Sequence, residues 1–153
     1  MANAPIDNVQ MEQTARRNLK QLIKKYNLSN GGDKDSLQKI LDYIASTPLY
    51  IALADGSTAE NIRVITLTTP DAVFVPLFTS KLDCGKIAES ADVKLMTPKD
   101  FIPLILELGH HAVVNPFGEY FLLWPELMRE HMLPYLEEYG SFVDQTFDNV
   151  PKS

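Results

Sequence analysis

The spacing of the apolar residues changes along this chain, and that change limits the folds that the chain can adopt. Over residues 9–26, and again from Leu37 to Ile44, apolar residues recur at the spacing of one helix face. From residue 49 onward, short runs rich in β-branched and aromatic residues alternate with turns and further helical stretches. This order of segments predicts a single α/β (α+β) domain, with a mixed sheet of about five strands flanked by helices.

Caps, turns and prolines set the limits of the predicted elements. Strands are predicted over 49–54, 62–68, 72–78, 93–96, 110–114 and 119–124. Helices are predicted over 9–26, from a cap at Asp35 to Pro48, over 81–89, from Thr97 to Gly109, and after Pro125. Pro76 predicts an edge or an end of its strand, because it cannot donate to a ladder. Pro103 predicts a bent or late-starting helix, and Pro134 a broken one.

Composition excludes several classes of protein. A chain of 153 residues with 45% hydrophobic and 22% charged residues suits one globular domain. No apolar run approaches the ~20 residues that cross a bilayer, so no membrane partner is expected. The N-terminal residues lack the pattern of a secretory signal and Cys84 is the only cysteine, which predicts a cytoplasmic protein. The net charge of -6 argues against nucleic acid as a partner.

The charges are distributed unevenly along the chain. Residues 9–26 carry five basic side chains against Glu12 alone, whereas residues 107–148 carry eight acidic side chains against Arg129 alone. Two solvated surfaces explain this pattern most simply, since exposed charge pairs contribute little. The alternative is that the basic helix docks on the acidic C-terminal region, within one chain or across a dimer.

The stretch "FVPLFTSKLD" carries the first candidates for chemistry. Ser80 is not in a G-x-S-x-G elbow, and its spacing to Asp83 is typical of a helix cap. Phe78, Thr79 and Ser80 are therefore interpreted as the corner where a strand becomes a helix. Cys84 follows an acid that would raise the pKa of its thiol, while its place in the first turn of a helix would lower that pKa. We interpret Cys84 as a structural thiol.

The histidines predict no metal site. His110 and His111 are adjacent on a predicted strand, so their side chains point to opposite faces and cannot easily bind one ion. His131 is the only other histidine, and no H-x-x-x-H pattern is present. No glycine-rich phosphate loop is present either. We expect neither a metal nor a cofactor.

The stretch "NPFGEYFLLWP" combines a turn with a run of aromatic residues. Asn115, Pro116 and Gly118 suit a tight turn, which explains their presence structurally. Phe117, Tyr120 and Trp124 add aromatic side chains beside it. Both faces of the strand at 119–124 are apolar, which indicates either that the strand is central or that one face meets a partner.

These motifs resemble a known family. "VFVPLFTS", "VKLMTPKDF" and "GHHAVVNPFGEYFLL", in this order and spacing, are similar to the N-terminal domain of SseB-like proteins, the enhanced-serine-sensitivity family. The resemblance spans roughly residues 36 to 130, and its motif positions are Pro76, Phe78, Thr79, Ser80, Asn115 and Pro116. It implies a small cytoplasmic bacterial α/β module with no established catalytic residues. We expect the second domain of longer family members to be absent, since little chain remains after residue 130, and the basic helix lies outside the resemblance.

The sequence thus predicts a basic helix and linker over 1–35, an SseB-like domain over 36–140 and a tail over 141–153. The expected function is a non-enzymatic interaction or regulatory module that binds a protein partner or a second copy of itself. Its candidate surface comprises Phe78, Thr79, Ser80, Asn115, Pro116, Phe117, Tyr120 and Trp124. Two alternatives stay open: a hydrolase that uses Ser80 or Cys84 with a histidine, and an immunity-type partner of another bacterial protein that uses the acidic C-terminal region.

Overall fold

The computed structural model describes residues 4–137, and the side chains from residue 10 onward except those of residues 135 and 137. Its helices are α1 (Ala4–Leu28), α2 (Lys34–Ser46), η1 (Leu82–Cys84), α3 (Ile87–Ser90), α4 (Pro98–Leu108), α5 (Pro125–Leu127), the π-helix η2 (Met128–Met132) and α6 (Leu133–Glu137). Its strands are β1 (Leu49–Leu53), β2 (Leu67–Thr68), β3 (Val73–Phe78), β4 (Asp92–Met96), β5 (His111–Val114) and β6 (Phe121–Leu123). The predicted tail at 141–153 lies outside the described residues.

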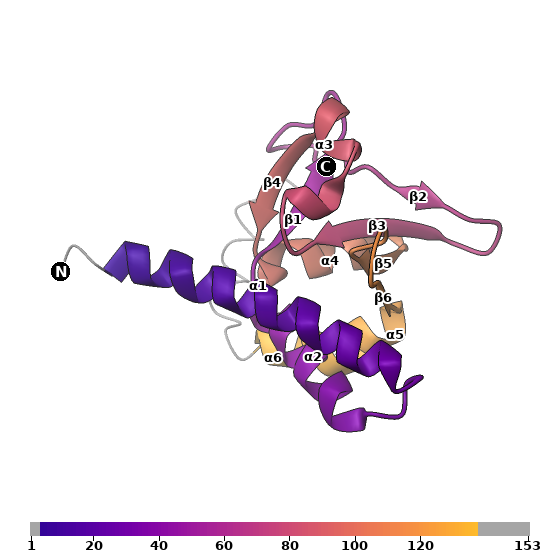
Figure 1. Cartoon of the computed structure of the whole chain (residues 1–153). Coiled ribbons are helices and arrows are strands. Elements are labelled where there is room, and N and C mark those ends of the chain that lie inside the picture. Colours follow the sequence, from indigo (N-terminus) through magenta and orange to yellow (C-terminus); the bar gives the residue numbers. More distant parts are fainter. Residues whose placement is uncertain (1–3, 138–153) are drawn as a thin grey trace.

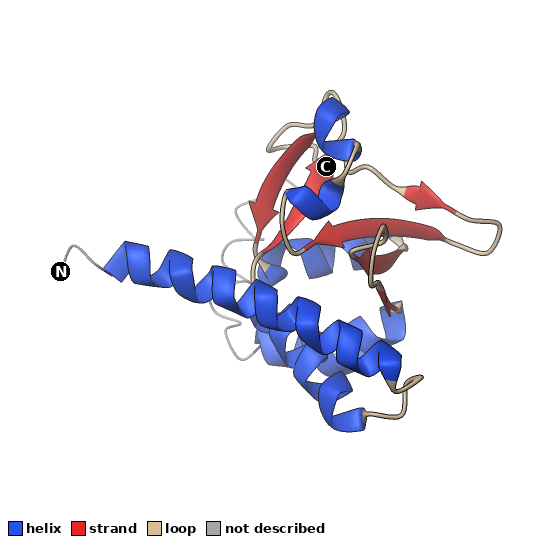
Figure 2. Ribbon diagram, in the orientation of Figure 1, coloured by secondary structure: helices blue, strands red, loops and turns tan. Residues whose placement is uncertain are grey.

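The strands form one mixed sheet, which confirms the predicted α/β class (Figures 1 and 2). The order is β4-β1-β3-β5-β6, with β2 paired to the first half of β3. Only β3 and β5 are parallel to each other, and the chain between them contributes η1, α3, β4 and α4. The carboxyl ends of β3 and β5 therefore lie side by side, which brings the F-T-S corner next to Asn115.

The main core lies between one face of the sheet and the helices. Alternate strand residues point to that face and are buried: Leu49, Ile51, Val75, Leu77, Ala112, Val114, Phe121 and Leu123. Side chains from α2, α4, η2 and α6 complete the core. Leu19 and Ile23 of α1 are fully buried in the same cluster, so the basic helix contributes to the core of the domain. None of the described helices is long and apolar enough to cross a membrane.

Pro76 lies in a central strand, so the prediction that it marks an edge or a strand end was wrong. The amide of Asn115 donates to the carbonyl of Leu77, which shows that the backbone of Leu77 faces β5. Because backbone groups alternate, the nitrogen of Pro76 faces the opposite side. On that side β1 pairs only with the end of β3 and β2 only with its beginning. Pro76 occupies the gap between the two ladders, where no donor is needed.

Two further predictions about strands and caps need correction. The predicted strand at 62–68 forms regular pairs only at Leu67 and Thr68, because the chain first bridges to β1 at Val64 and then moves across to β3. The second helix is capped by Asp33, not by Asp35. The carboxylate of Asp33 accepts the amide of Ser36 at 3.1 Å.

The two helix prolines behave differently. Pro103 lies within α4 without delaying its start, which is at Pro98 as the sequence predicts. Pro134 is the second residue of α6, with only Leu133 between it and the end of the π-helical segment η2. Since a proline removes one amide donor from the helical ladder, a local change in hydrogen-bond spacing is expected there. The predicted break thus takes the form of a change in helix type.

Candidate functional site

The corner after β3 is held by side chains of its own residues. The hydroxyl of Ser80 accepts the amide of Asp83 at 3.1 Å and donates to the carboxylate of Asp83 at 2.8 Å. This is the capping arrangement that the Ser80-x-x-Asp83 spacing predicts. The hydroxyl of Thr79 donates to the same carboxylate oxygen at 2.8 Å. Both hydroxyl groups therefore use their single proton inside the corner.

Asn115 joins this corner to the end of β5. Its side-chain oxygen accepts the amide of Thr79 at 3.0 Å, and its side-chain nitrogen donates to the Thr79 hydroxyl at 2.9 Å. Both residues are buried, and Asn115 has a φ of 53°, in the left-handed region that asparagine tolerates better than most residues. The residues around Asn115 predict turn chemistry, but nothing local in the sequence indicates this contact with Thr79, which links residues 36 positions apart.

Asp83 extends the corner to the basic helix. Its second carboxylate oxygen accepts Lys20 of α1 at 2.8 Å. Burial would raise the pKa of Asp83, but the hydrogen bonds from Lys20, Thr79 and Ser80 together outweigh it and hold the pKa below its ordinary value of 3.8. Asp83 is thus ionised at neutral pH and links α1, the corner and, through Thr79, Asn115.

The lowered pKa of Asp83 predicts a specific loss of stability in acid. The folded state binds this proton more weakly than the unfolded state, so the carboxylate stabilises the fold above pH 3.8 and stops doing so as the pH falls through the lower, folded pKa. We expect the difference in unfolding free energy between the wild type and Asp83→Asn to be largest near neutral pH and to shrink below about pH 4.

Urea denaturation at a series of pH values measures this difference. Asp55→Asn, which alters an exposed acid on the loop after β1, is the matched control. A difference between wild type and Asp83→Asn that stays constant down to the acid transition would contradict the assigned role of Asp83.

The possible nucleophiles have no histidine partner in the described part of the chain. Cys84 is fully buried, and burial followed by the charge of Asp83 raises the pKa of its thiol. Its sulfur contacts the Ser80 carbonyl at 3.7 Å. His111 instead packs against Trp124, with ring centroids 4.9 Å apart, and against Phe74. Among the described residues, no group of three metal-binding side chains is present.

The structure divides the predicted surface into two parts. Phe78, Thr79 and Asn115 are buried, and Phe117 lies over them with its ring centroid 6.2 Å from that of Phe78. Tyr120 and Trp124 lie elsewhere, where they line a groove along β6. Phe117, Tyr120 and Trp124 are 57%, 48% and 41% exposed, so each has aromatic surface available to a partner.

The groove along β6 has apolar walls and a volume of about 630 Å³. It is lined by Tyr26 and Asn27 of α1, Leu37 of α2, Phe121 and Leu122 of β6 with the flanking Tyr120 and Trp124, and Leu127 of α5. Asn27 donates to the Tyr120 carbonyl at 3.0 Å and to Glu119 at 3.1 Å, which fixes the end of α1 beside the strand. None of these lining residues carries a formal charge.

The backbone of Leu122 faces this groove. The backbone amide of Asn115 hydrogen-bonds to β3, and the backbone of Val113, two residues earlier, faces the same way. The backbone groups of Ala112 and Val114 therefore face β6. Their partners on β6 are Leu123 and Phe121, so the intervening Leu122 points its amide and carbonyl away from the sheet. Among the described strands β6 is the last in the order, so its edge is open at Leu122, whereas the neighbouring carbonyl of Tyr120 is already bonded by Asn27 of α1.

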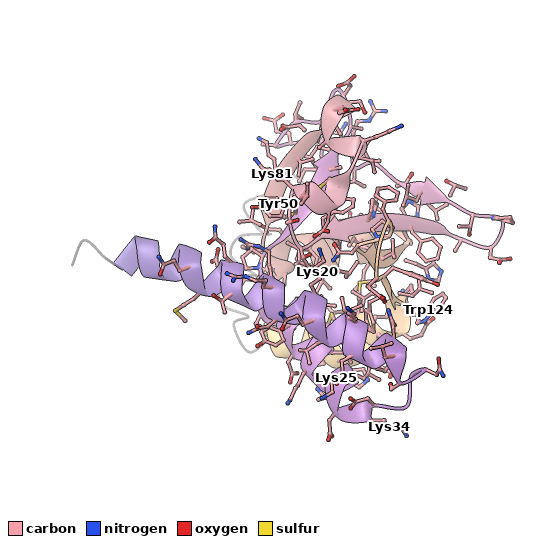
Figure 3. The ribbon with its side chains drawn as sticks, viewed as in Figure 1. Lys20, Lys25, Lys34, Tyr50, Lys81 and Trp124 are labelled. Atoms are coloured by element: carbon pink, nitrogen blue, oxygen red, sulfur yellow. The ribbon has the colours of Figure 1, made fainter. Side chains whose placement is uncertain are left out.

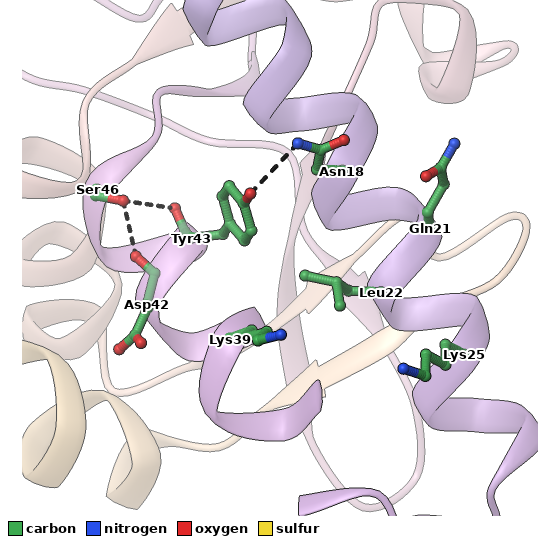
Figure 4. Close-up of a pocket in the computed structure, with 8 residues that line it drawn as sticks. All are labelled: Asn18, Gln21, Leu22, Lys25, Lys39, Asp42, Tyr43 and Ser46. Carbon is green, nitrogen blue, oxygen red and sulfur yellow. Dashed lines mark hydrogen bonds between the residues drawn. The ribbon is translucent and has the colours of Figure 1, made fainter. Parts of the chain in front are cut away.

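Two of the other hollows beside α1 are lined in part by charged side chains. One, of about 610 Å³, lies between α1 and α2 and is lined by Asn18, Gln21, Leu22, Lys25, Lys39, Asp42, Tyr43 and Ser46 (Figure 4). Its side chains are mostly exposed, and Asn18 donates to the Tyr43 hydroxyl at 3.3 Å across it. The other, of about 360 Å³, lies between α1 and the F-T-S corner.

No protein-family model, curated protein or solved structure matches this chain. The resemblance to SseB-like proteins therefore stays a prediction from the order and spacing of its motifs. Of its motif positions, Pro76 lies within β3, Phe78 ends that strand, Thr79 and Ser80 form the corner, and Asn115 and Pro116 follow β5.

Proposed function

We propose that this chain is a non-catalytic protein-interaction module of SseB-like type, whose groove along β6 binds an extended apolar segment of a partner protein. The observation that carries the proposal is the open edge of β6. The strand has the aromatic and aliphatic composition of a central strand, yet it ends the sheet. The sequence offers two explanations for the two apolar faces of this strand: a central position in the sheet, or contact of one face with a partner. Because the strand lies at the edge of the sheet, contact with a partner is favoured.

The chemistry of the groove fits an added strand. Leu122 offers one amide and one carbonyl, the pair of groups with which an extended peptide extends a sheet. The side chains of Tyr120 and Trp124 flank that position and supply aromatic area for alternate side chains of the peptide. The absence of charge among the lining residues favours an uncharged segment. At the opposite end of the sheet, β4 carries Asp92 and Lys94, charges that discourage such pairing.

The arrangement of the corner supports a non-catalytic role. The Thr79 and Ser80 protons are both donated to Asp83, and Cys84 is buried with a raised pKa. A hydrolase would need a histidine nitrogen within ~3 Å of one of these nucleophiles. Among the described residues, no hydrogen bond joins a histidine to Ser80 or Cys84. The hydrolase alternative therefore ranks behind an interaction module.

A proline at position 122 tests the proposal sharply. Leu122→Pro removes the outward amide, which makes no bond within the sheet, so the edge strand can accept the substitution. Leu122→Thr removes the same side chain but keeps the amide and is the matched control. We expect peptides selected from a random-sequence display library against the wild type to bind Leu122→Thr, and to lose at least about tenfold in affinity for Leu122→Pro.

The proposal also requires that the selected peptides have alternating apolar residues, because a strand presents every second side chain to the same face. Peptides that bind all three proteins equally well would show that the edge of β6 is not the binding site. A library that yields no binders, with sedimentation showing a strict monomer, would count against both a foreign partner and a second copy. Far-ultraviolet circular dichroism of both variants checks that the fold is retained.

A further inference from the structure

The hollow between α1 and the F-T-S corner gathers cations in a protein of net negative charge. It is lined by Gln13, Arg16, Arg17, Lys20, Tyr50, Thr79, Ser80 and Asp83. Three of these side chains are cationic and one is anionic, whereas the chain as a whole carries a net charge of -6. Lys81 follows Ser80 directly and adds an exposed cation on this side of the molecule (Figure 3).

Arg16 gives this hollow a fixed cationic group. The residue is only 5% exposed. One of its terminal nitrogens donates to the Pro48 carbonyl at 3.2 Å, and its guanidinium lies 5.3 Å from the centroid of the Tyr50 ring. Its remaining donors make no hydrogen bond to described residues and are not sealed from solvent. A buried arginine held in place with donors directed to a hollow is suited to bind an oxyanion.

The other groups divide into those that are already engaged and those that can bind a ligand. The protons of Thr79 and Ser80 are given to Asp83, so neither hydroxyl can donate to a ligand. Lys20 uses one of its three donors on Asp83. Arg17 is exposed and, within the described residues, has no ion-pair partner. The available donors are therefore those of Arg16, Arg17 and Lys20, all from one side of α1.

We propose that this hollow binds the phosphate group of a small soluble molecule. Its volume of about 360 Å³ falls within the range of ordinary small-ligand sites, about 300–1,000 Å³. It also lies just beyond the carboxyl end of β3, the part of an α/β sheet where ligands commonly bind. Guanidinium groups pair with phosphate through two parallel hydrogen bonds, and Lys20 adds a third positive charge. No residue lines both this hollow and the groove along β6, so the two proposals stand independently.

Calorimetric titration of the full chain with pyrophosphate tests this site. The variants are Arg17→Gln, which alters an exposed side chain, and Arg16→Lys, which keeps the charge but removes the planar fork. Lys24→Gln is the matched control, since Lys24 is an exposed cation of the same helix that does not line the hollow. We expect saturable binding by the wild type and Lys24→Gln, and a loss of about tenfold for each arginine variant.

Because the same phosphate chemistry occurs on lipid headgroups, vesicles containing phosphatidic acid form a second arm. Binding of pyrophosphate that is lost in the arginine variants supports the proposal. No saturable binding at millimolar pyrophosphate, equal binding by all four proteins, or binding to the vesicles without binding to pyrophosphate would each overturn it. Arg17→Gln should not disturb the fold, because the Arg17 side chain makes no contact within the core. Its result therefore stays interpretable if Arg16→Lys fails to fold.

Discussion

Replacing Ile23 by alanine is expected to destabilise the whole protein by about 2–5 kcal/mol. Ile23 is fully buried in the core cluster, although it belongs to the basic helix that lies outside the SseB-like resemblance. Truncation removes buried methyl groups and leaves a cavity between α1, α2 and the sheet, both of which cost free energy. Urea denaturation followed by circular dichroism measures the change, and a single cooperative transition is expected.

Met11→Ala on the same helix is the matched control for this prediction. Met11 is 68% exposed, so its truncation should change the unfolding free energy by less than about 0.5 kcal/mol. If Ile23→Ala costs no more than Met11→Ala, then α1 is an appendage and not part of the core. In that case both hollows beside α1, and the groove whose wall it forms, would lose their structural basis.

Asn115→Ala is expected to lower the free energy of unfolding by about 2–5 kcal/mol. The substitution leaves the buried amide of Thr79 without an acceptor, which costs about 1–3 kcal/mol. It also places alanine at a φ of 53°, a conformation that costs most residues about 1–2 kcal/mol. The loss follows from the position of Asn115 at the junction of the two parallel strands, and urea denaturation measures it.

Asn115→Gly separates the two causes, because glycine adopts a positive φ without strain. Glycine should therefore be less destabilising than alanine by about 1 kcal/mol, while still losing the bonds to Thr79. The bond from the Thr79 amide to the Asn115 side chain can be followed by hydrogen exchange of that amide, which should accelerate in both variants. A nearly neutral Asn115→Ala would mean that the corner and the end of β5 are held together by other contacts.

The sequence predicts several local features of the fold correctly, although it places the cap of the second helix at Asp35 and the structure places it at Asp33. The capping bond between Ser80 and Asp83 spans three residues, and the start of α4 at Thr97-Pro98 depends on adjacent residues. Such features depend on the stereochemistry of residues that lie within a few positions of one another in the sequence. The α/β class followed for the same reason, since the period of the apolar residues identifies each element before any packing is known.

Long-range features were the ones that the sequence could not supply. Pro76 was assigned to an edge because nothing local indicates that β3 changes partners at that residue. The bond between Thr79 and Asn115 requires β3 and β5 to be parallel neighbours, which no short motif encodes. The basic hollow has no signature of its own in the sequence, where its cations are simply part of one helix face. Its donors are side chains of a helix, so a search for a phosphate loop does not find them.

Hydrogen exchange at the amide of Leu122 tests most directly whether β6 has an open edge that binds a partner. In the full-length protein alone, this amide should exchange rapidly, while the amides of Phe121 and Leu123, paired with β5, exchange slowly. Saturation with a peptide selected by the display experiment should slow the exchange at Leu122 by at least about tenfold. An amide at Leu122 that is already protected in the protein alone, or that is unaffected by the bound peptide, would contradict the account.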